Sequence, residues 1–439
     1  MGAISKQKDI VSNLNSFSLP LIFNAVFNTI ISSFMAAIVG RISIQAIAST
    51  QVVDSFIYAL LGILGVFSLS FNINSSKIRL KDENLFRNYF KSILEVNFLI
   101  GLIFLFVFIF FFKYILKILY GFDGQVLYIG SLYSSVLSFS ILFQMLIFAM
   151  SNLMKVRKKT KPIMMVGIIS SILQLLTTYI FVYFVFESEY KIIGVALGFV
   201  ISLFTQLSSY IYILRDDFKK LKNIKSSNKL LLLKKSIPLV MQEILEGAIF
   251  SVCITALISR LSIIEFSSYS VCLKVTSISF MMVYMYCNGI IIIIGECISK
   301  KDMESLRLIP KISLKLILGI YFITGIIFAL LKDYIIRFFT DQADIITRGL
   351  ELLLFIIIIN SFQIFFEVSK YSLQALGFEH RVLKITGVVN FSIIAILLIV
   401  NLVYEINIYI ILSFLASNYF VLYILFNQNY KKEVSKLEV

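Results

Sequence analysis

The stretch that decides the fold is Phe98–Phe112, FLIGLIFLFVFIFFF, which contains no charged side chain. Its apolar residues follow neither a strand period nor a helical period. Similar uncharged or nearly uncharged blocks occur at Ile163–Phe186 and Ile385–Val403. Each block is close to the ~20 residues needed to cross a hydrocarbon core of ~30 Å. Because lipid offers no hydrogen bonds to the backbone, such blocks are expected to be helices.

The composition of the whole chain supports a membrane protein. Hydrophobic residues make up 59% and charged residues 15% of the 439 residues, whereas soluble domains carry roughly 25% charged residues. A membrane barrel would show ~10-residue alternating segments, and the sequence has none. We therefore predict an all-α membrane protein with twelve transmembrane helices in two six-helix bundles. The predicted helices lie near 17–39, 48–72, 93–112, 126–150, 162–186, 193–214, 236–259, 266–296, 312–331, 349–371, 385–403 and 408–427.

The basic residues predict the orientation of these helices. Thirty of the 40 lysines and arginines lie at the termini or in the loops that follow even-numbered helices. One example is the run Lys155–Lys161 after the fourth helix. The positive-inside rule then places both termini in the cytoplasm, which requires an even number of crossings. We attribute the net charge of +15 to topology, and we expect no nucleic-acid partner.

An internal repeat relates the two halves. Matched residues keep an offset of 218 to 221 positions, and repeats at a fixed spacing indicate a duplicated architecture. Because each half has an even number of helices, the halves share one orientation, which is the parallel type of repeat. We expect an N-terminal lobe at 1–222, a basic linker at 223–235 and a C-terminal lobe at 236–439. The matched pairs are Pro20 with Pro238, Arg41 with Arg260, Asp82 with Asp302, Leu85 with Leu306, Gln144 with Gln363, and Gly167 with Gly387.

Over most of its length the chain resembles the MATE (multidrug and toxic compound extrusion) exporters. Each half opens with a helix that carries an early proline, and helices 4 and 10 end in the loops Met154–Pro162 and Leu373–Gly377. Helix 7 reads PLVMQEILEGAIF from Pro238 to Phe250. In the NorM-like branch a cation-coordinating glutamate lies eight residues after this proline, with a phenylalanine four residues later. Glu246 and Phe250 match that spacing, and the resemblance implies export of organic solutes driven by inward Na⁺ or H⁺ movement.

The chain departs from the family pattern at the other ion-binding positions. The NorM-like branch has an aspartate in helix 10 that aligns with Gln363, and the DinF-like branch has one in helix 1, where this chain has Asn24 and Asn28. The coupling ion, H⁺ or Na⁺, therefore stays open.

Charged residues deep in the predicted helices are the main functional candidates, because an ionisable group at the bilayer centre costs a few kcal/mol. Glu246 lies eleven residues past Lys235, which places it ~16 Å into the membrane, and Glu243 shares its helix face. A carboxyl at this depth could exchange a proton or bind Na⁺. The alternative is a buried ion pair with Lys274, which lies in helix 8 at the position corresponding to Asp54. Lys274 could also repel cations or bind an anionic substrate.

Helix 10 carries a second polar group of residues. Gln363, Glu367, Lys370 and Gln374 follow helical spacing along one face, which should face the bundle interior or a watery cavity. Glu367 could replace the missing aspartate, or Glu367 and Lys370 could neutralise each other.

Polar residues in the first half are candidates for a cavity lining. Asn24, Asn28, Asp54, Gln144 and Gln174 all fall within predicted helices. Hydrogen bonds between helices are the alternative explanation for each of them.

These observations favour a secondary active efflux transporter that exports organic or drug-like solutes by alternating access. An enzyme is not expected, since the chain has one histidine, His380, and neither a metal-ligand motif nor a phosphate loop. The alternatives are a flippase for a lipid-linked saccharide and an exporter of a peptide or natural product. We expect no cofactor, no metal beyond possible Na⁺ at Glu246, a small organic substrate, contact with membrane lipid, a monomer, and the plasma membrane as location.

Overall fold

The computed structural model describes residues 2–187, 190–222 and 224–437, and every regular element in this part of the chain is a helix. Twelve of these helical segments are long and apolar enough to cross a membrane. In chain order the elements are α1 (Gly2–Gly40), α2 (Ile44–Ile78), α3 (Glu83–Tyr120), α4 (Gly124–Val156), α5 (Thr160–Ile180), η1 (Phe181–Val185), α6 (Lys191–Ile213), α7 (Arg215–Leu221), α8 (Lys229–Glu243), η2 (Ile244–Phe250), α9 (Ser251–Ser259), α10 (Ile263–Lys300), α11 (Met303–Leu330), α12 (Lys332–Phe339), α13 (Ala343–Ala375), α14 (Glu379–Val403) and α15 (Ile408–Lys436).

The chain divides into two compact units, which are described separately. The N-terminal unit comprises residues 20–75 and 82–236, and the C-terminal unit comprises residues 1–19, 76–81 and 237–439. The boundaries fall inside α1, α2 and α8, and in α1 and α8 they lie close to the repeated prolines Pro20 and Pro238. The expected linker at 223–235 is helical from Lys229 onward. The lobe boundaries expected from the sequence stay a prediction.

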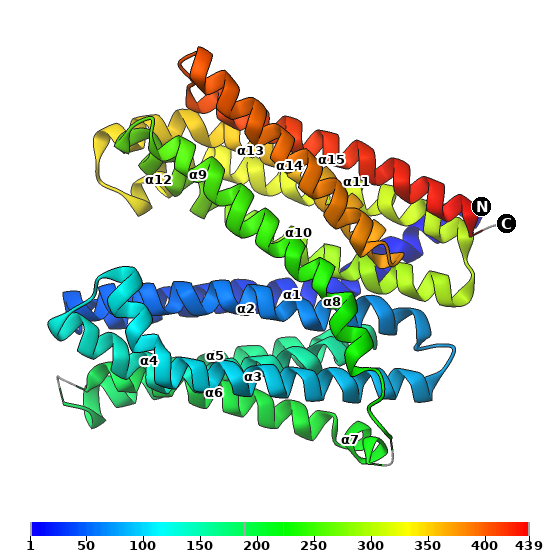
Figure 1. Cartoon of the computed structure of the whole chain (residues 1–439), viewed down its shortest axis with the longest axis horizontal. Helices are drawn as coiled ribbons and strands as arrows, with labels where there is room; N and C mark the ends of the chain where they lie inside the picture. The colour runs from blue at the N-terminus through cyan, green and yellow to red at the C-terminus, as the bar shows by residue number, and fades with distance from the viewer. Residues whose placement is uncertain (1, 188–189, 223, 438–439) are drawn as a thin grey trace. The chain divides into compact units, whose positions relative to one another are not determined.

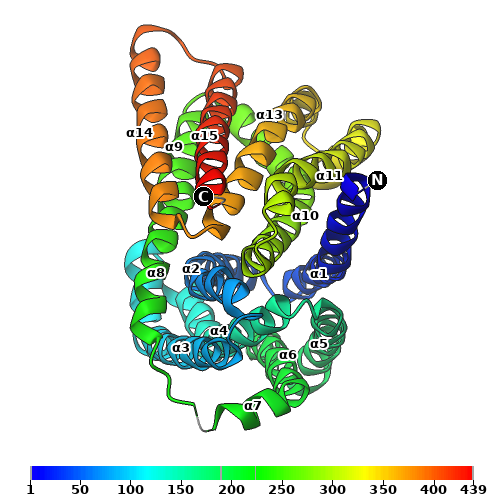
Figure 2. The same ribbon diagram turned by 90° about the vertical axis from the view of Figure 1, so that its right-hand side faces the viewer.

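Helix packing follows the same order in both units. In the N-terminal unit α3 packs on α4, α4 on α6, and α6 on α5. In the C-terminal unit the corresponding helices α11, α13, α15 and α14 pack in that same order, and α10 also packs on α11 and α13 (Figures 1 and 2). The duplicated sequence therefore gives a duplicated helix arrangement, as the parallel repeat predicts.

The sequence repeat also gives the third helix of each unit the same kind of N-terminal cap. The Asp82 carboxylate accepts a hydrogen bond from the Leu85 backbone N–H at 2.9 Å and caps α3. The Asp302 carboxylate accepts one from the Ser305 N–H at 3.1 Å and caps α11. An aspartate at this position satisfies one of the unpaired donors at a helix start, so the repeated aspartates set where the third helix of each unit begins.

An aromatic core holds the N-terminal unit together. Phe108 and Phe112 of α3 stack with ring centroids 4.4 Å apart, and Phe56 of α2 meets Phe112 edge-on at 5.1 Å. Phe112 is fully buried. The uncharged Phe98–Phe112 stretch thus supplies core contacts on one face and, through exposed residues such as Phe110, a surface for lipid on the other.

Close helix approach depends on small residues, as is usual in membranes. A side chain at Gly198 of α6 would lie within 2.0 Å of the Thr178 hydroxyl and 3.0 Å of the Thr178 backbone nitrogen on α5. Because the backbone cannot move aside, glycine is required here. The contact lets α5 and α6 of the N-terminal unit pack together closely.

The structure differs from the sequence-based expectation in three ways. Most helices extend beyond the expected spans. They continue into the polar interfacial region, where the residues are no longer apolar and hydrophobicity does not mark the end of a helix. Two short helices, α7 and α12, lie outside the predicted helices; Tyr334 and Phe338 of α12 are exposed while Ile336 is buried. The π-helical segment η1 ends the helix expected at 162–186, and η2 interrupts the one expected at 236–259.

A candidate ion-coupling site in the C-terminal unit

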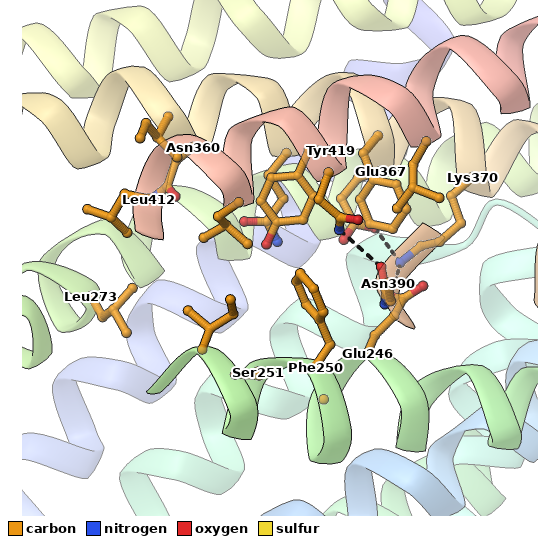
Figure 3. A pocket seen from close by; sticks show the side chains of 18 of the residues that line it. Glu246, Phe250, Ser251, Leu273, Asn360, Glu367, Lys370, Asn390, Leu412 and Tyr419 are labelled. Atoms are coloured by element: carbon orange, nitrogen blue, oxygen red, sulfur yellow. Dashed lines mark hydrogen bonds and ion pairs between the residues drawn. The ribbon is translucent and has the colours of Figure 1, made fainter. Parts of the chain in front are cut away.

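Glu246 lies in the π-helical segment η2, between α8 and α9. Its backbone carbonyl accepts a hydrogen bond from the Ser251 N–H, five residues later. Such wide turns are rare and occur mostly at functional sites. The turn places the carboxylate of Glu246 and the ring of Phe250 along one cavity of about 510 Å³ within the C-terminal unit (Figure 3).

An ion-pair cluster occupies one side of this cavity. Lys370 Nζ of α13 lies 2.8 Å from Glu246 Oε2 and 2.8 Å from Glu367 Oε2. Figure 3 shows Glu246 and Lys370 reaching toward each other from opposite helices. Glu367 and Lys370 are 2% and 7% exposed, so protein atoms shield these two groups, while Glu246 is half-buried.

Neighbouring groups hold the cluster in place. The Gln242 amide donates to Glu246 Oε1 at 2.7 Å, and the Gln374 amide donates to Gln242 Oε1 at 2.9 Å. The ammonium of Lys370 also lies 4.6 Å from the centre of the Phe366 ring, a distance typical of a cation–π contact. These contacts fix the side chains of α8, η2 and α13 relative to one another.

The cavity carries a surplus of negative charge. Glu243, Glu246 and Glu367 all line it, and Lys370 is the cation among its described lining residues. With all four groups ionised, three carboxylates against one ammonium leave two uncompensated negative charges. Glu367 and Lys370 are buried, Glu246 is half-buried and Glu243 is exposed. Such a site can accept a proton or a hard cation, because oxygen ligands suit such ions and added positive charge relieves the repulsion.

The structure brings together most residues of the second half that the sequence singled out. Glu243, Glu246, Phe250, Gln363, Glu367 and Lys370 all line the cavity. Lys274 is exposed on α10 and is not among the described residues that line it. The partner of Glu246 is therefore Lys370, and the alternative pairing with Lys274 is not the one observed.

Several residues in or beside the cavity were missed by sequence reasoning. Gln242 lies one turn before Glu246, a spacing that could have suggested its hydrogen bond. Asn390 of α14 accepts a hydrogen bond from the Asn418 amide of α15 at 3.0 Å. The tyrosines Tyr371 and Tyr419 also line the cavity. Nothing in the sequence distinguishes these two from the other tyrosines of the chain.

The N-terminal unit contains a cavity of its own, of about 610 Å³. Asp54, Gln144 and Gln174 line it together with Tyr133, whose hydroxyl donates a hydrogen bond of 2.8 Å to Asp54 Oδ1. Met35 and Phe199 supply apolar lining. Three of the five candidates of the first half thus meet at one cavity.

Asn24 and Asn28 of α1 face another helix instead. The Ser171 hydroxyl of α5 donates to Asn28 Oδ1 at 2.6 Å. The Asn24 side chain lies against Gly167, where an added methyl group would come within 2.0 Å of Asn24 Oδ1. Neither asparagine is among the described lining residues of the N-terminal cavity. For this pair the structure shows interhelical packing, which was the alternative explanation.

The helix arrangement and the two polar cavities define a membrane transporter built from two related six-helix bundles. The MatE family model matches residues 20–180 and 238–400. The chain therefore belongs to the MATE family of transporters. No curated protein matches the sequence.

Several solved structures are similar to this chain over nearly its whole length. The Vibrio cholerae MATE transporter VcmN in its bent form has a TM-score of 0.86 at 13% identity, with 99% of each chain covered. A MOP superfamily transporter from Pyrococcus furiosus, described as having a binding pocket of reverse polarity, has a TM-score of 0.85 at 12% identity, with 99% of this chain and 97% of that chain covered. An outward-facing multidrug resistance MATE transporter has a TM-score of 0.85 at 12% identity, covering 97% of this chain and 96% of that one. At such identities the likeness establishes the fold.

Proposed function

We propose that this MATE family transporter exports organic solutes in exchange for inward movement of H⁺ or Na⁺, and that Glu246, Glu243 and Glu367 form its ion-coupling site. The observation that carries the proposal is the cluster in which Lys370 bridges Glu246 and Glu367 inside a cavity with surplus negative charge. Ionisable groups within membrane helices that face a cavity mark ion pathways in many transporters.

In this proposal the ammonium of Lys370 acts as an internal counter-ion that competes with the coupling cation. Its ammonium occupies the position between two carboxylates where a coupling cation would bind. A proton or Na⁺ that binds Glu246 weakens the attraction between Glu246 and Lys370. The Lys370 ammonium then keeps Glu367 as its counter-ion. Because a ligand shifts a conformational equilibrium only by its differential affinity for the two states, this exchange of counter-ions is the step that links ion binding to a change in the bundle.

The N-terminal cavity is proposed to contribute to solute binding. It combines the Asp54 carboxylate with aromatic and thioether side chains, including Tyr133, Phe199 and Met35. Ligand sites are mostly apolar with a few placed polar groups, and a carboxylate beside aromatic rings suits an organic cation. Gln144 and Gln174 would supply hydrogen bonds to polar groups of the solute.

The alternative of a flippase for a lipid-linked saccharide draws less support from the site. A pyrophosphate-linked substrate requires uncompensated positive charge in the cavity. Lys370 is instead held between two carboxylates, and Lys274 is exposed. An exporter of a positively charged peptide would be compatible with the same acidic cavity.

We further propose that the protein is a monomer in the plasma membrane with both termini in the cytoplasm. The support is the excess of basic residues in the loops on the side of the termini. Labelling of a tag at each terminus in sealed cells would test this orientation, and reaction with an impermeant reagent from outside would contradict it.

The coupling proposal is tested with purified protein in liposomes under an imposed H⁺ or Na⁺ gradient. We expect Glu246→Gln to abolish gradient-driven export of organic cations, because the amide neither exchanges a proton nor binds Na⁺ as a carboxylate does. Asp333→Asn, in the exposed helix α12, removes a carboxylate outside the cavity and should transport normally. If Glu246→Gln transports as well as the unmodified protein, Glu246 is not the coupling residue.

A further inference from the structure

A groove lined by lysines lies in the C-terminal unit and shares no described lining residue with either cavity described above. It has a volume of about 890 Å³ and lies between the beginning of α1 and the first half of α11. From α1 it is lined by Gln7, Lys8, Val11 and Ser12, and from α11 by Leu308, Lys311, Ile312, Leu314, Lys315 and Leu316.

The groove is anchored at one end by ion pairs between the same two helices. Lys6 Nζ of α1 lies 3.8 Å from Asp302 Oδ1, at the start of α11, and Lys6 also pairs with Glu304. These contacts use the acidic groups at the start of α11. No acidic residue is among the described residues that line the groove.

The three lysines of the groove are exposed, and none forms an ion pair with another described residue. Three like charges gathered along one groove repel one another, so an anion placed there would be stabilised by all three. Val11, Leu308 and Ile312 are half-buried beneath them. The groove therefore combines a cationic rim with an apolar floor.

The helical rise along α11 predicts a depth near the lipid headgroups. From Lys311 to Leu330, where α11 ends, the helix rises about 28 Å, and from Lys315 about 22 Å. Taking Leu330 as the opposite boundary of a hydrocarbon core of about 30 Å, we expect Lys311 at the boundary with the headgroups and Lys315 one turn inside it. A lysine at that depth extends its ammonium toward the interface. We expect Leu314 and Leu316 at the level of the acyl chains.

We propose that this groove binds an anionic phospholipid from the leaflet on the side of the N-terminus. The phosphate contacts Lys8, Lys311 and Lys315, and the acyl chains lie along the apolar lining that Ile312 and Leu316 provide. Basic pockets between membrane helices bind lipids of this kind through charge. The lipid would add to the stability of the contact between α1 and α11, which the ion pairs of Lys6 already support.

The test uses the full-length protein in a neutral detergent, titrated with phosphatidylglycerol or with phosphatidylcholine and followed by native mass spectrometry. Each lysine near a charged membrane surface contributes about fivefold in affinity. We therefore expect the variant with Lys8→Gln, Lys311→Gln and Lys315→Gln to bind phosphatidylglycerol about a hundredfold more weakly, with phosphatidylcholine binding unchanged.

A matched control separates a site from general charge attraction. The variant with Lys220→Gln, Lys222→Gln and Lys225→Gln loses the same charge at exposed positions of the N-terminal unit and should bind phosphatidylglycerol as the unmodified protein does. Equal loss in both triple variants, or no loss in the first, would overturn the proposal. So would competition by glycerol phosphate as strong as that by the lipid. Should the first triple variant fail to fold, Ser12→Glu alone tests the site, because a carboxylate in the groove should expel the anionic lipid.

Discussion

Lys370 Nζ lies 2.8 Å from Glu246 Oε2, and the two residues are 124 positions apart in the chain. The same ammonium lies 2.8 Å from Glu367 Oε2, one turn earlier on its own helix. One cation thus joins α13 to the π-helical turn of η2. The charges of the cavity neutralise one another only in part, because Glu243 also lines it.

Removing the ammonium should destabilise the protein. In Lys370→Gln, Glu246 and Glu367 lose their counter-ion, and breaking a buried ion pair from one side typically costs about 3–5 kcal/mol. We expect a lower thermal unfolding temperature in detergent, and partial recovery in the double variant Lys370→Gln with Glu367→Gln. A double variant no more stable than Lys370→Gln alone would contradict the pairing.

The same substitution should alter ion selectivity. Without Lys370 the carboxylates are free to bind an external cation, so Lys370→Gln should show tighter Na⁺ binding than the unmodified protein, together with uncoupled transport. Isothermal titration with NaCl against choline chloride measures the first effect. Unchanged Na⁺ affinity would show that the ammonium does not compete with the coupling ion.

Glu367 should contribute to coupling in place of the aspartate that the family resemblance implies at Gln363. In Glu367→Gln, Lys370 relies on Glu246 alone, and the exchange of counter-ions loses its second partner. We expect the dependence of transport on the H⁺ or Na⁺ gradient to flatten. Gln363→Ala removes a neutral lining residue and should leave that dependence intact. If transport by Glu367→Gln depends on the H⁺ or Na⁺ gradient as it does in the unmodified protein, Glu367 has no role in coupling.

Asp54 should govern affinity for cationic solutes in the N-terminal cavity. Interactions with a charged group contribute about 1.5–3 kcal/mol, so Asp54→Asn should weaken binding of organic cations by about tenfold or more. Neutral solutes of similar size should be unaffected. Asp123→Asn, exposed before α4, is the matched control. Equal losses for cationic and neutral solutes would indicate a structural role instead.

The repeated helix caps should both contribute to stability, and Asp302 should contribute somewhat more because it also pairs with Lys6. Asp82→Ala and Asp302→Ala each remove a cap worth about 1 kcal/mol, which thermal unfolding in detergent can compare. Burial acts to raise the pKa of Asp302, but hydrogen bonds from Ser305 and the charge of Lys6 outweigh it and hold the pKa below its ordinary value of 3.8. The stabilisation by ionised Asp302 is therefore complete above that value and is lost as the pH falls through the lowered one. If Asp302→Ala lowers stability as much at the lowest pH as at neutral pH, this account is contradicted.

The sequence by itself determined the membrane class, the twelve crossings and the duplicated plan. Long apolar runs such as Phe98–Phe112 suffice because lipid forces the backbone into helices. The repeat could be recognised because matched residues such as Asp82 and Asp302 have the same local task in each copy. The depth of Glu246 in the membrane was predicted from the helical rise and stays a prediction. All these properties depend on neighbours along the chain or on the solvent.

The tertiary structure decided which charges meet. Lys274 and Lys370 both lie within long apolar helices, and depth does not distinguish them as partners for Glu246. The rotation of α10 and α13 about their axes decides which lysine faces Glu246, and packing against neighbouring helices sets that rotation. The wide turn of η2 and the separation of the candidates into two cavities likewise depend on side chains far apart in sequence. That is why most charged residues of the candidate site, and the pair Glu367–Lys370 within one helix, could be proposed from the sequence, whereas the pairing of Glu246 with Lys370 could not.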